Sequence, residues 1–259
     1  MQAALKIIDN VAFIEPVHTK AYGKKKEVYP LKTQADIDKI ARYFLDQARI
    51  ARLIKHKQDF RDNLRNYLFL MMGINTGLRA SDLCLLRWSD IFAPDYTFID
   101  SPYFYITEKK TSKQRYMHLN ADIKRVIKWY LAQINDPTPD LSSLVFTSRK
   151  SKDKPIPTGT MSDLLTEVGQ KVGLPYRIST HSLRKTFGYR LYTSSGRSPE
   201  ALVLLQKVFG HSSPEITLRY IGMDIEQIYS AYDKVSGNAL SNEELDKALT
   251  NDFSEEVSE

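Results

Sequence analysis

The sequence has only one cysteine, Cys84, in 259 residues, so it has no disulfide within the chain and no cysteine-rich zinc site. It also lacks a long apolar run. The longest nearly apolar stretch, residues 67–74, is far shorter than the roughly 20 residues of a membrane-spanning helix. The N-terminus has no charged-then-apolar signal pattern. These absences exclude disulfide scaffolds, zinc fingers and membrane-spanning proteins, and we expect a cytoplasmic protein.

Several cofactor motifs are missing as well. There is no Walker A loop, no dinucleotide-binding glycine motif and no His-Glu-x-x-His, and His18, His56 and His118 have no histidine partner at helical spacing. Cys84 lies among leucines, which is typical of a buried structural thiol rather than a nucleophile. We therefore expect neither a cofactor nor a metal.

The charge is unevenly distributed along the chain. Apolar residues make up 42% and charged residues 26%, as in ordinary globular proteins. The net charge is +6, but residues 237–259 hold seven acids and only one base, Lys247, so the rest of the chain carries +12. A basic body with an acidic tail favours a polyanionic partner, nucleic acid above all, over a membrane surface or an acidic protein.

Hydrophobic periodicity and cap residues predict a mainly α fold with a small antiparallel β-sheet. Thr33 is expected to cap a first helix with apolar residues at helical spacing, and Gly77 to end a second over 59–75. Two short strands, 103–107 and 115–119, flank a polar turn, and a third is expected near 144–146. Further helices are predicted over 121–133, 160–172, 181–194 and 199–209.

Polar residues cluster where a helical scaffold has no need of them. On a helix, His181, Arg184 and Gly188 share one face, beside an apolar stripe of Leu183 and Phe187. A mid-helix glycine costs about 1 kcal/mol relative to alanine, so something must approach this face closely. Two interpretations are open: a bound ligand, or a packed helix with His181 as a cap.

Three more short motifs surround this helix in the sequence. Residues 75–82 join two helices through Gly77 and place Arg79 one turn before Asp82, the spacing of a simple surface ion pair. Residues 198–200 start a helix with the predicted stripe Ala201, Leu204, Leu205 and Val208, which Gly210 ends. His211 follows, and Tyr220 lies nine positions later, two turns into a short helix capped at Ser213.

Together these motifs resemble the tyrosine recombinase, or phage integrase, family. The matching segments are residues 76–83, the hairpin 110–115, His181-x-x-Arg184, and Gly210-His211-Ser212 followed by Tyr220, in the family order and with family-like spacing across residues 29–236. The resemblance implies the catalytic-domain architecture of that family and a site-specific DNA recombinase that cleaves and rejoins DNA through a 3′-phosphotyrosyl intermediate. It implies an enzyme of DNA integration and mobile genetic elements that needs no cofactor.

The resemblance also implies a role for each motif residue, and the chemistry of the side chains agrees with it. Tyr220 would be the nucleophile, Arg79 and Arg184 would hold the phosphate oxygens, and Lys110 would protonate the leaving oxygen. His181 would assist proton transfer at the tyrosine, His211 would hydrogen-bond the phosphate, and Asp82 would support Arg79. The expected DNA contacts are made by Lys24, Lys25, Lys26, Lys113 and Arg115. Four other tyrosines, Tyr189, Tyr192, Tyr229 and Tyr232, lack the spacing to His211 and are expected to pack or cap.

Three segments follow from this interpretation. Residues 1–28 are expected to form a basic arm or a solvated tail, 29–236 the catalytic domain, and 237–259 an acidic tail. The family usually carries a core-binding domain before the catalytic one, so the chain resembles either the short members that lack a full core-binding domain or a fragment of a longer protein. Ser241 and Glu244 predict a capping box there, so residues 237–250 are either a helix that docks on a neighbouring subunit or part of a disordered tail.

The expected partners are double-stranded DNA, other copies of the chain in a tetramer on paired sites, and accessory DNA-bending proteins, with no membrane. Two other functions stay open at this point. A type IB topoisomerase shares the chemistry but relaxes supercoils as a monomer, and a DNA-binding regulator keeps the fold without strand exchange.

Overall fold

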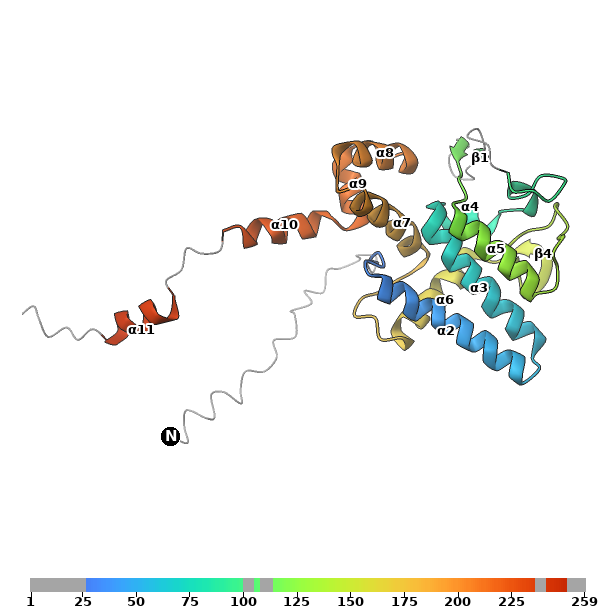
Figure 1. The fold of residues 1–259 in the computed structure, drawn as a ribbon, viewed down its shortest axis with the longest axis horizontal. Helices are drawn as coiled ribbons and strands as arrows, with labels where there is room; N and C mark the ends of the chain where they lie inside the picture. The colour runs from blue at the N-terminus through green and yellow to red at the C-terminus, as the bar shows by residue number, and fades with distance from the viewer. Residues whose placement is uncertain (1–26, 100–104, 108–113, 236–240, 251–259) are drawn as a thin grey trace, which may run out of the picture.

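The computed structural model describes residues 27–99, 105–107, 114–235 and 241–250. Most of the chain in these ranges is helical, with two small two-stranded sheets (Figure 1). None of the helices in these ranges is both long and apolar enough to cross a membrane. In chain order the elements are α2 (Gln34–Leu53), α3 (Lys57–Thr76), α4 (Ala80–Cys84), η1 (Trp88–Asp90), β1 (Tyr105–Thr107), β2 (Gln114–Tyr116), α5 (Ala121–Gln133), β3 (Thr147–Ser148), β4 (Ser151–Pro155), α6 (Thr158–Lys171), α7 (Thr180–Ser194), α8 (Pro199–Phe209), α9 (Pro214–Ile221), α10 (Asp224–Asp233) and α11 (Asn242–Thr250).

Cap residues set most of the helix bounds, as predicted. The Thr33 side chain accepts a hydrogen bond from the Asp36 amide, and Ser213 accepts one from the Ile216 amide. Gly77 and Gly210 end α3 and α8 in the left-handed conformation, with φ of 64° and 67°. These turns matter for function because each one leads directly into a motif residue, Arg79 or His211.

The apolar residues form two separate cores. The larger one is built by α2 to α6 and the start of α7, and it includes Phe44, Leu68 and Phe146. The smaller one is built by α7, α8 and α9 around Leu205 and Phe209. Because α7 contributes Leu183 to the larger core and Tyr192 to the smaller, it is the element that joins them.

The β structure is smaller than predicted and differently placed. β1 and β2 pair antiparallel, with Ile106 opposite Arg115, and β2 ends at Tyr116 rather than at residue 119. The predicted strand at 144–146 is wrong: Leu144 makes only one isolated bridge, to Arg87. Pairing instead begins at Thr147, where β3 and β4 form a hairpin that sequence patterning missed because its exposed strand is Ser-Lys-Asp-Lys-Pro.

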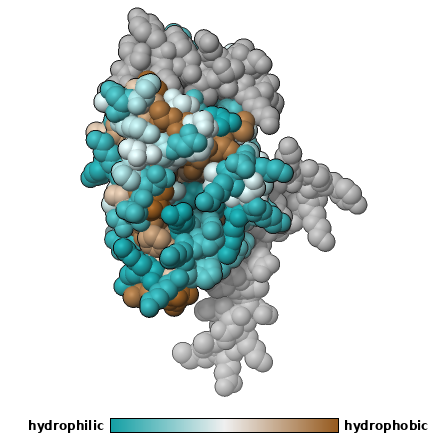
Figure 2. Space-filling view, turned by 90° about the vertical axis from the view of Figure 1, so that its right-hand side faces the viewer, coloured by the Kyte–Doolittle hydropathy of each residue, from teal (hydrophilic) through white to brown (hydrophobic). Residues whose placement is uncertain are grey.

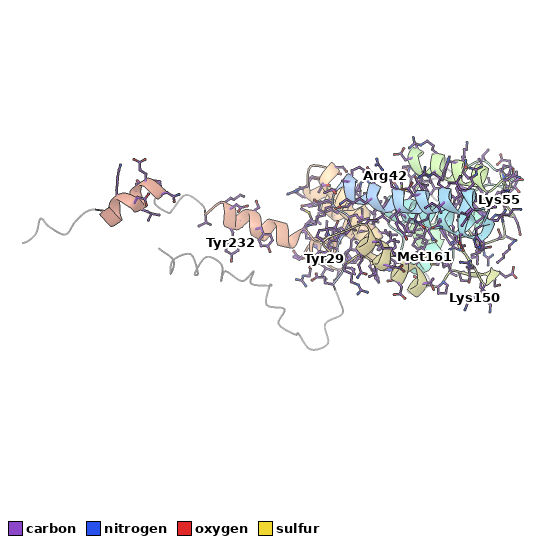
Figure 3. All side chains as sticks on the ribbon, turned by 90° about the horizontal axis from the view of Figure 1, so that it is seen from below. Tyr29, Arg42, Lys55, Lys150, Met161 and Tyr232 are labelled. Carbon is purple, nitrogen blue, oxygen red and sulfur yellow. The ribbon has the colours of Figure 1, made fainter. Side chains whose placement is uncertain are left out.

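The C-terminal helices differ from the compact body. α10 extends away from it (Figure 1), and Tyr229 and Tyr232 are 66% and 74% exposed. Figure 3 shows Tyr232 out on this helix. The expectation that these two tyrosines pack or cap is therefore wrong, whereas Tyr192 is buried as predicted. The capping box at the start of α11 is confirmed, since Ser241 and Glu244 exchange side-chain and backbone hydrogen bonds.

Candidate active site

Arg184 sits at the junction of the two cores. It lies on α7 with only 6% of its surface exposed, and its guanidinium donates hydrogen bonds to the carbonyl oxygens of Gly77 and Phe209, the latter at 3.3 Å. These carbonyls belong to the C-terminal ends of α3 and α8, where the helix dipole is negative and favours a cation. The guanidinium carbon also lies 4.5 Å from the centroid of the Phe209 ring. Arg184 is thus fixed in place by two helix ends.

Tyr220 lies beside this arginine on α9. Burial raises the pKa of its hydroxyl above the ordinary value, while the charges of Arg184 and Arg79 and a hydrogen bond from Arg184 act in the opposite direction. The charges of both predicted arginines therefore act on the hydroxyl of the predicted nucleophile. Burial still dominates, so the hydroxyl stays protonated at neutral pH until a base or a bound phosphate alters its surroundings.

His211 approaches Tyr220 from the turn after α8. The two ring centroids are 5.1 Å apart in an edge-to-face arrangement. His211 Nδ1 lies 3.0 Å from Thr217 Oγ1, and that hydroxyl donates to the Ser213 carbonyl oxygen at 3.3 Å. Which of Nδ1 and Oγ1 donates depends on the tautomer of the ring, and in either case the contact fixes the orientation of the His211 ring.

Arg79 and Asp82 lie where α4 begins. Arg79 is the N-terminal cap residue of this helix, and its carbonyl oxygen accepts hydrogen bonds from the Asp82 and Leu83 amides, both at 2.9 Å. The Asp82 side chain is buried, and one of its oxygens accepts a hydrogen bond from the Ser81 hydroxyl at 3.3 Å. Gly77, in the left-handed conformation, ends α3 and turns the chain into α4, at whose start Arg79 lies.

His181 is exposed at the second residue of α7, and it is not the cap. Ser179 caps this helix, accepting a hydrogen bond from the His181 amide at 3.2 Å, so the expectation of His181 as a cap is wrong. The packing interpretation of Gly188 is confirmed. A Cβ there would come within 2.7 Å of Ile221 and of the Phe209 ring, so protein rather than ligand is what approaches this face.

Other predicted site residues are not placed by the structure. Lys24, Lys25, Lys26, Lys110 and Lys113 lie outside the described residues. Arg115 lies in β2, opposite Ile106, and only its backbone is described. The two strands of the predicted hairpin, β1 and β2, pair as expected, and the lysine segment lies between them in the sequence.

Sequence reasoning missed two residues of this site. The centroid of the Phe209 ring lies 5.3 Å from that of Tyr220 and 5.4 Å from that of His211, so this ring packs against both side chains. In the sequence, its position four residues after Leu205 and directly before the capping glycine could have indicated that Phe209 is buried there. Lys185 was also missed. Its Nζ lies 5.6 Å from the centroid of the Tyr220 ring and donates to the Val28 carbonyl oxygen at 2.8 Å.

Val28 belongs to a short segment without helix or strand structure, residues 28–32, which we call the strap. Besides accepting from Lys185, the strap donates from the Leu31 amide to Thr186 Oγ1 at 2.8 Å. Lys32 Nζ reaches the Gly222 carbonyl oxygen at 3.5 Å, just after α9. The strap thus connects the helix of Arg184 to the end of the helix of Tyr220.

Comparison with known proteins agrees with this geometry. Residues 43–227 match the model of the phage integrase family. The chain is 30% identical over 210 residues to a protein named probable integrase/recombinase YoeC, from Bacillus subtilis, covering 81% of this chain and 98% of that one. It is 27% identical to the type 1 fimbriae regulatory protein FimB of Escherichia coli K12, covering 80% and 96%.

Solved structures show the same fold at lower identity. The crystal structure of XerA recombinase superposes with a TM-score of 0.53 at 19% identity, covering 83% of this chain and 68% of that chain. The post-cleavage complex of the XerH site-specific recombinase with its difH substrate gives a TM-score of 0.52 at 19% identity, covering 82% and 54%.

Proposed function

The chain belongs to the phage integrase family and is a site-specific DNA recombinase of the tyrosine type, and we propose that it acts through a 3′-phosphotyrosyl intermediate on Tyr220. The observation that carries this proposal is the packing of Tyr220 against Phe209 and His211 beside the buried Arg184, where the charges of Arg184 and Arg79 both act to lower the pKa of the Tyr220 hydroxyl. A phosphoryl transition state carries negative charge on its non-bridging oxygens, and two guanidinium groups beside the attacking oxygen stabilise that charge.

In the proposed cleavage step, the Tyr220 oxygen attacks the phosphorus of one DNA strand. A bond forms between this oxygen and phosphorus, and the bond from phosphorus to the 5′-oxygen breaks, leaving a 3′-phosphotyrosine and a 5′-hydroxyl. Lys110 supplies the proton to the 5′-oxygen, and His181, exposed at the start of α7, assists removal of the tyrosine proton. Attack by a 5′-hydroxyl from another strand reverses the step and rejoins the DNA, so no external energy source is needed.

Arg184 enters this reaction already oriented. Its two carbonyl contacts, to Gly77 and Phe209, fix the plane of a guanidinium that has five donor hydrogens. A charged donor that is preorganised in this way costs little reorganisation when the transition state forms. Asp82, buried one turn from Arg79, supports the second arginine.

The contact of His211 with Thr217 supports its proposed role. Nδ1 lies 3.0 Å from Thr217 Oγ1, and this contact orients the imidazole ring. We therefore propose that His211 hydrogen-bonds the phosphate through its other ring nitrogen. Thr217 then acts as a positioning residue that fixes the ring orientation.

We also propose the arrangement of the whole chain on DNA. Residues 1–28 form a basic arm on the DNA, 29–236 form the catalytic domain, and 237–259 form a tail of which residues 237–250 dock on a neighbouring subunit. An exposed apolar side chain on α11 supports this docking, since Leu245 is 45% exposed. Four subunits would assemble on paired sites, with accessory DNA-bending proteins, in the cytoplasm where the DNA substrate is.

Trapping the covalent intermediate tests the proposal. A nicked duplex made from inverted repeats that flank the gene should give a protein–DNA adduct that survives denaturant, with EDTA present throughout. Tyr220→Phe should abolish the adduct and keep DNA binding, because it removes only the hydroxyl. Tyr232→Phe, a matched change at an exposed tyrosine, should leave the adduct unchanged. An undiminished adduct in Tyr220→Phe would assign the nucleophile to another tyrosine, and relaxation of plasmids without the repeats would indicate a topoisomerase.

A further inference from the structure

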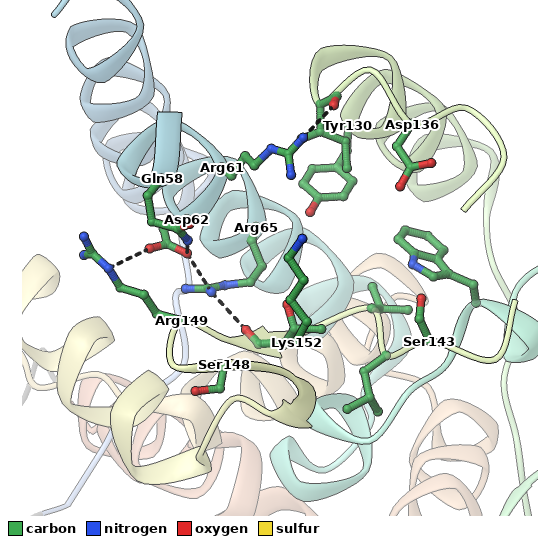
Figure 4. A pocket seen from close by; sticks show the side chains of 15 residues that line it. Gln58, Arg61, Asp62, Arg65, Tyr130, Asp136, Ser143, Ser148, Arg149 and Lys152 are labelled. Carbon is green, nitrogen blue, oxygen red and sulfur yellow. Dashed lines mark hydrogen bonds and ion pairs between the residues drawn. The ribbon is translucent and has the colours of Figure 1, made fainter. Parts of the chain in front are cut away.

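A polar cavity lies at the other end of the helical body from Tyr220. It has a volume of about 250 Å³ and opens between α3, α5 and the segment that leads into the β3–β4 hairpin (Figure 4). Arg65, on its wall, precedes the end of α3 by eleven residues, or about 17 Å along the helix axis. Lys150 on the hairpin and Tyr29 on the strap lie at opposite ends of the body (Figure 3). The cavity is therefore separate from the phosphate site of the reaction.

Cations outnumber carboxylates around this cavity. Its walls carry Arg61, Arg65, Arg149 and Lys152 against Asp62 and Asp136. Asp62 is already shared, since it lies 2.8 Å from Arg65 and 3.7 Å from Arg149. Arg61 and Lys152 make no ion pair with any other residue that the structure describes, although Arg61 Nη2 donates a hydrogen bond to the Ile134 carbonyl oxygen at 3.4 Å. A neutral carbonyl leaves the charge of Arg61 uncompensated, so the surplus of positive charge is located on these two side chains.

The third group in the cavity is the Tyr130 hydroxyl. Tyr130 is 6% exposed, and its ring stacks on Trp88 with centroids 6.4 Å apart. Burial raises the pKa of this hydroxyl to about 12, against the opposing charges of Arg65 and Arg61, so at neutral pH it is a hydrogen-bond donor. Figure 4 shows Lys152 pointing toward this hydroxyl, with Arg61 beside the same ring.

Two cations and a neutral hydroxyl that point into one cavity form a binding site for an oxyanion. We propose that Arg61, Lys152 and Tyr130 bind a phosphate group, either a phosphodiester of DNA beyond the cleavage site or the phosphate of a small free compound. Guanidinium and ammonium donors prefer phosphate oxygens, and the hydroxyl adds a directed donor. The cavity is smaller than the roughly 300–1,000 Å³ of sites for drug-sized ligands. This size fits one phosphate with a small attached group.

Exposed lysines lie beside the cavity. The described residues on the side of the molecule that faces the viewer in Figure 2 are mostly hydrophilic, with smaller hydrophobic patches. On the hairpin itself, Lys152 and Lys154 are both exposed, but Lys154 lines no part of the cavity. Lys154 therefore provides a control that removes the same charge from the same strand.

Binding of inorganic phosphate tests the proposal directly. Trp129→Phe leaves Trp88, which lines the cavity, as the single tryptophan of the chain. Its fluorescence should change saturably with sodium phosphate and not with sodium chloride at equal ionic strength. Lys152→Met should weaken phosphate affinity about 10- to 100-fold, the effect of removing a charged hydrogen bond. Lys154→Met should leave the affinity unchanged.

A response to phosphate that does not saturate, or an equal loss of affinity in Lys154→Met, would overturn the proposal. Given saturable binding, DNA titrations identify the source of the phosphate. If the DNA backbone supplies it, Lys152→Met should reduce the slope of log affinity against log salt by about 0.9 more than Lys154→Met does. If a free compound supplies it, the two variants should bind DNA equally. The covalent-adduct assay with Tyr220 is independent of both results.

Discussion

Replacing Gly188 by alanine has two opposing effects on stability: alanine favours the helix, but its Cβ overlaps neighbouring side chains. Gly188 is inside α7, where alanine is intrinsically favoured over glycine by about 1 kcal/mol. The added Cβ, however, would lie 2.7 Å from Ile221 Cγ2 and from two carbons of the Phe209 ring. Carbon atoms pack best at about 3.5–4.0 Å, so the ring and the methyl group must move by close to 1 Å.

The steric effect is expected to win. Overpacking a core costs about 1–3 kcal/mol, and three close contacts with an aromatic ring and a helix neighbour place this site at the upper end of that range. Subtracting the gain in helix propensity leaves a net decrease of about 2 kcal/mol in the free energy of unfolding. Cleavage should fall as well, because Phe209 carries the carbonyl that accepts from Arg184 and the ring that contacts Tyr220.

Urea denaturation followed by tyrosine fluorescence or circular dichroism measures the stability, and adduct formation on nicked DNA measures the cleavage. Gly159→Ala is the matched control, since Gly159 is also helical and a Cβ there meets no atom within 4 Å. It should be neutral or stabilise the protein by up to about 1 kcal/mol. If Gly188→Ala also stabilises the protein and cleaves normally, Phe209 and Ile221 do not pack tightly against α7.

Three further predictions concern parts of the chain that sequence alone assigns. Lys110→Ala should slow cleavage of normal DNA by about 10²–10⁴-fold and recover most of the rate on a 5′-bridging phosphorothiolate, whose sulfur leaves without a proton; equal slowing on both substrates would make Lys113 the next candidate for the acid. Deleting residues 20–26 should flatten the salt dependence of DNA binding, because the slope is about 0.9 for each phosphate that the arm neutralises; an unchanged slope would remove the arm from the interface. Truncation after Gly237 should preserve binding and cleavage of a single site and abolish strand exchange, whereas normal recombination would contradict docking in trans.

The helices were predictable because their signals are local. A helix of 11 residues over 199–209 follows from Ser198 as cap, Pro199 at the first position and Gly210 at the end, and the structure has these bounds. The buried face of this helix was less predictable. Leu204 was expected in the apolar stripe, yet it is 51% exposed, while Phe209 is fully buried. Which side of an apolar helix meets a core depends on neighbours that the sequence of the helix does not contain.

The same contrast holds for the candidate site. Motif spacing predicted Arg79, Arg184, His211 and Tyr220 as site residues, and the structure places His211 against Tyr220 and Arg184 against Phe209. Motif spacing could not indicate Lys185, because the partner of Lys185 is Val28, which is 157 residues away and contributes a backbone carbonyl rather than a side chain. Backbone acceptors leave no trace in residue identity, so contacts of this kind become visible only in three dimensions.

The strap links the N-terminal side of the described chain to the surroundings of Tyr220. Its carbonyl at Val28 holds the lysine that lies over the Tyr220 ring, and Lys32 reaches the residue that ends the helix of Tyr220. A displacement of the strap would therefore change contacts on the helix of Arg184 and at the end of the helix of Tyr220, and it would also disturb Leu31, which packs in the larger core. For protein engineering, this means that a fusion joined close to Val28 would lie next to the hydrogen bond between Val28 and Lys185. A shortened enzyme that starts after Val28 would lack the carbonyl oxygen that accepts from Lys185.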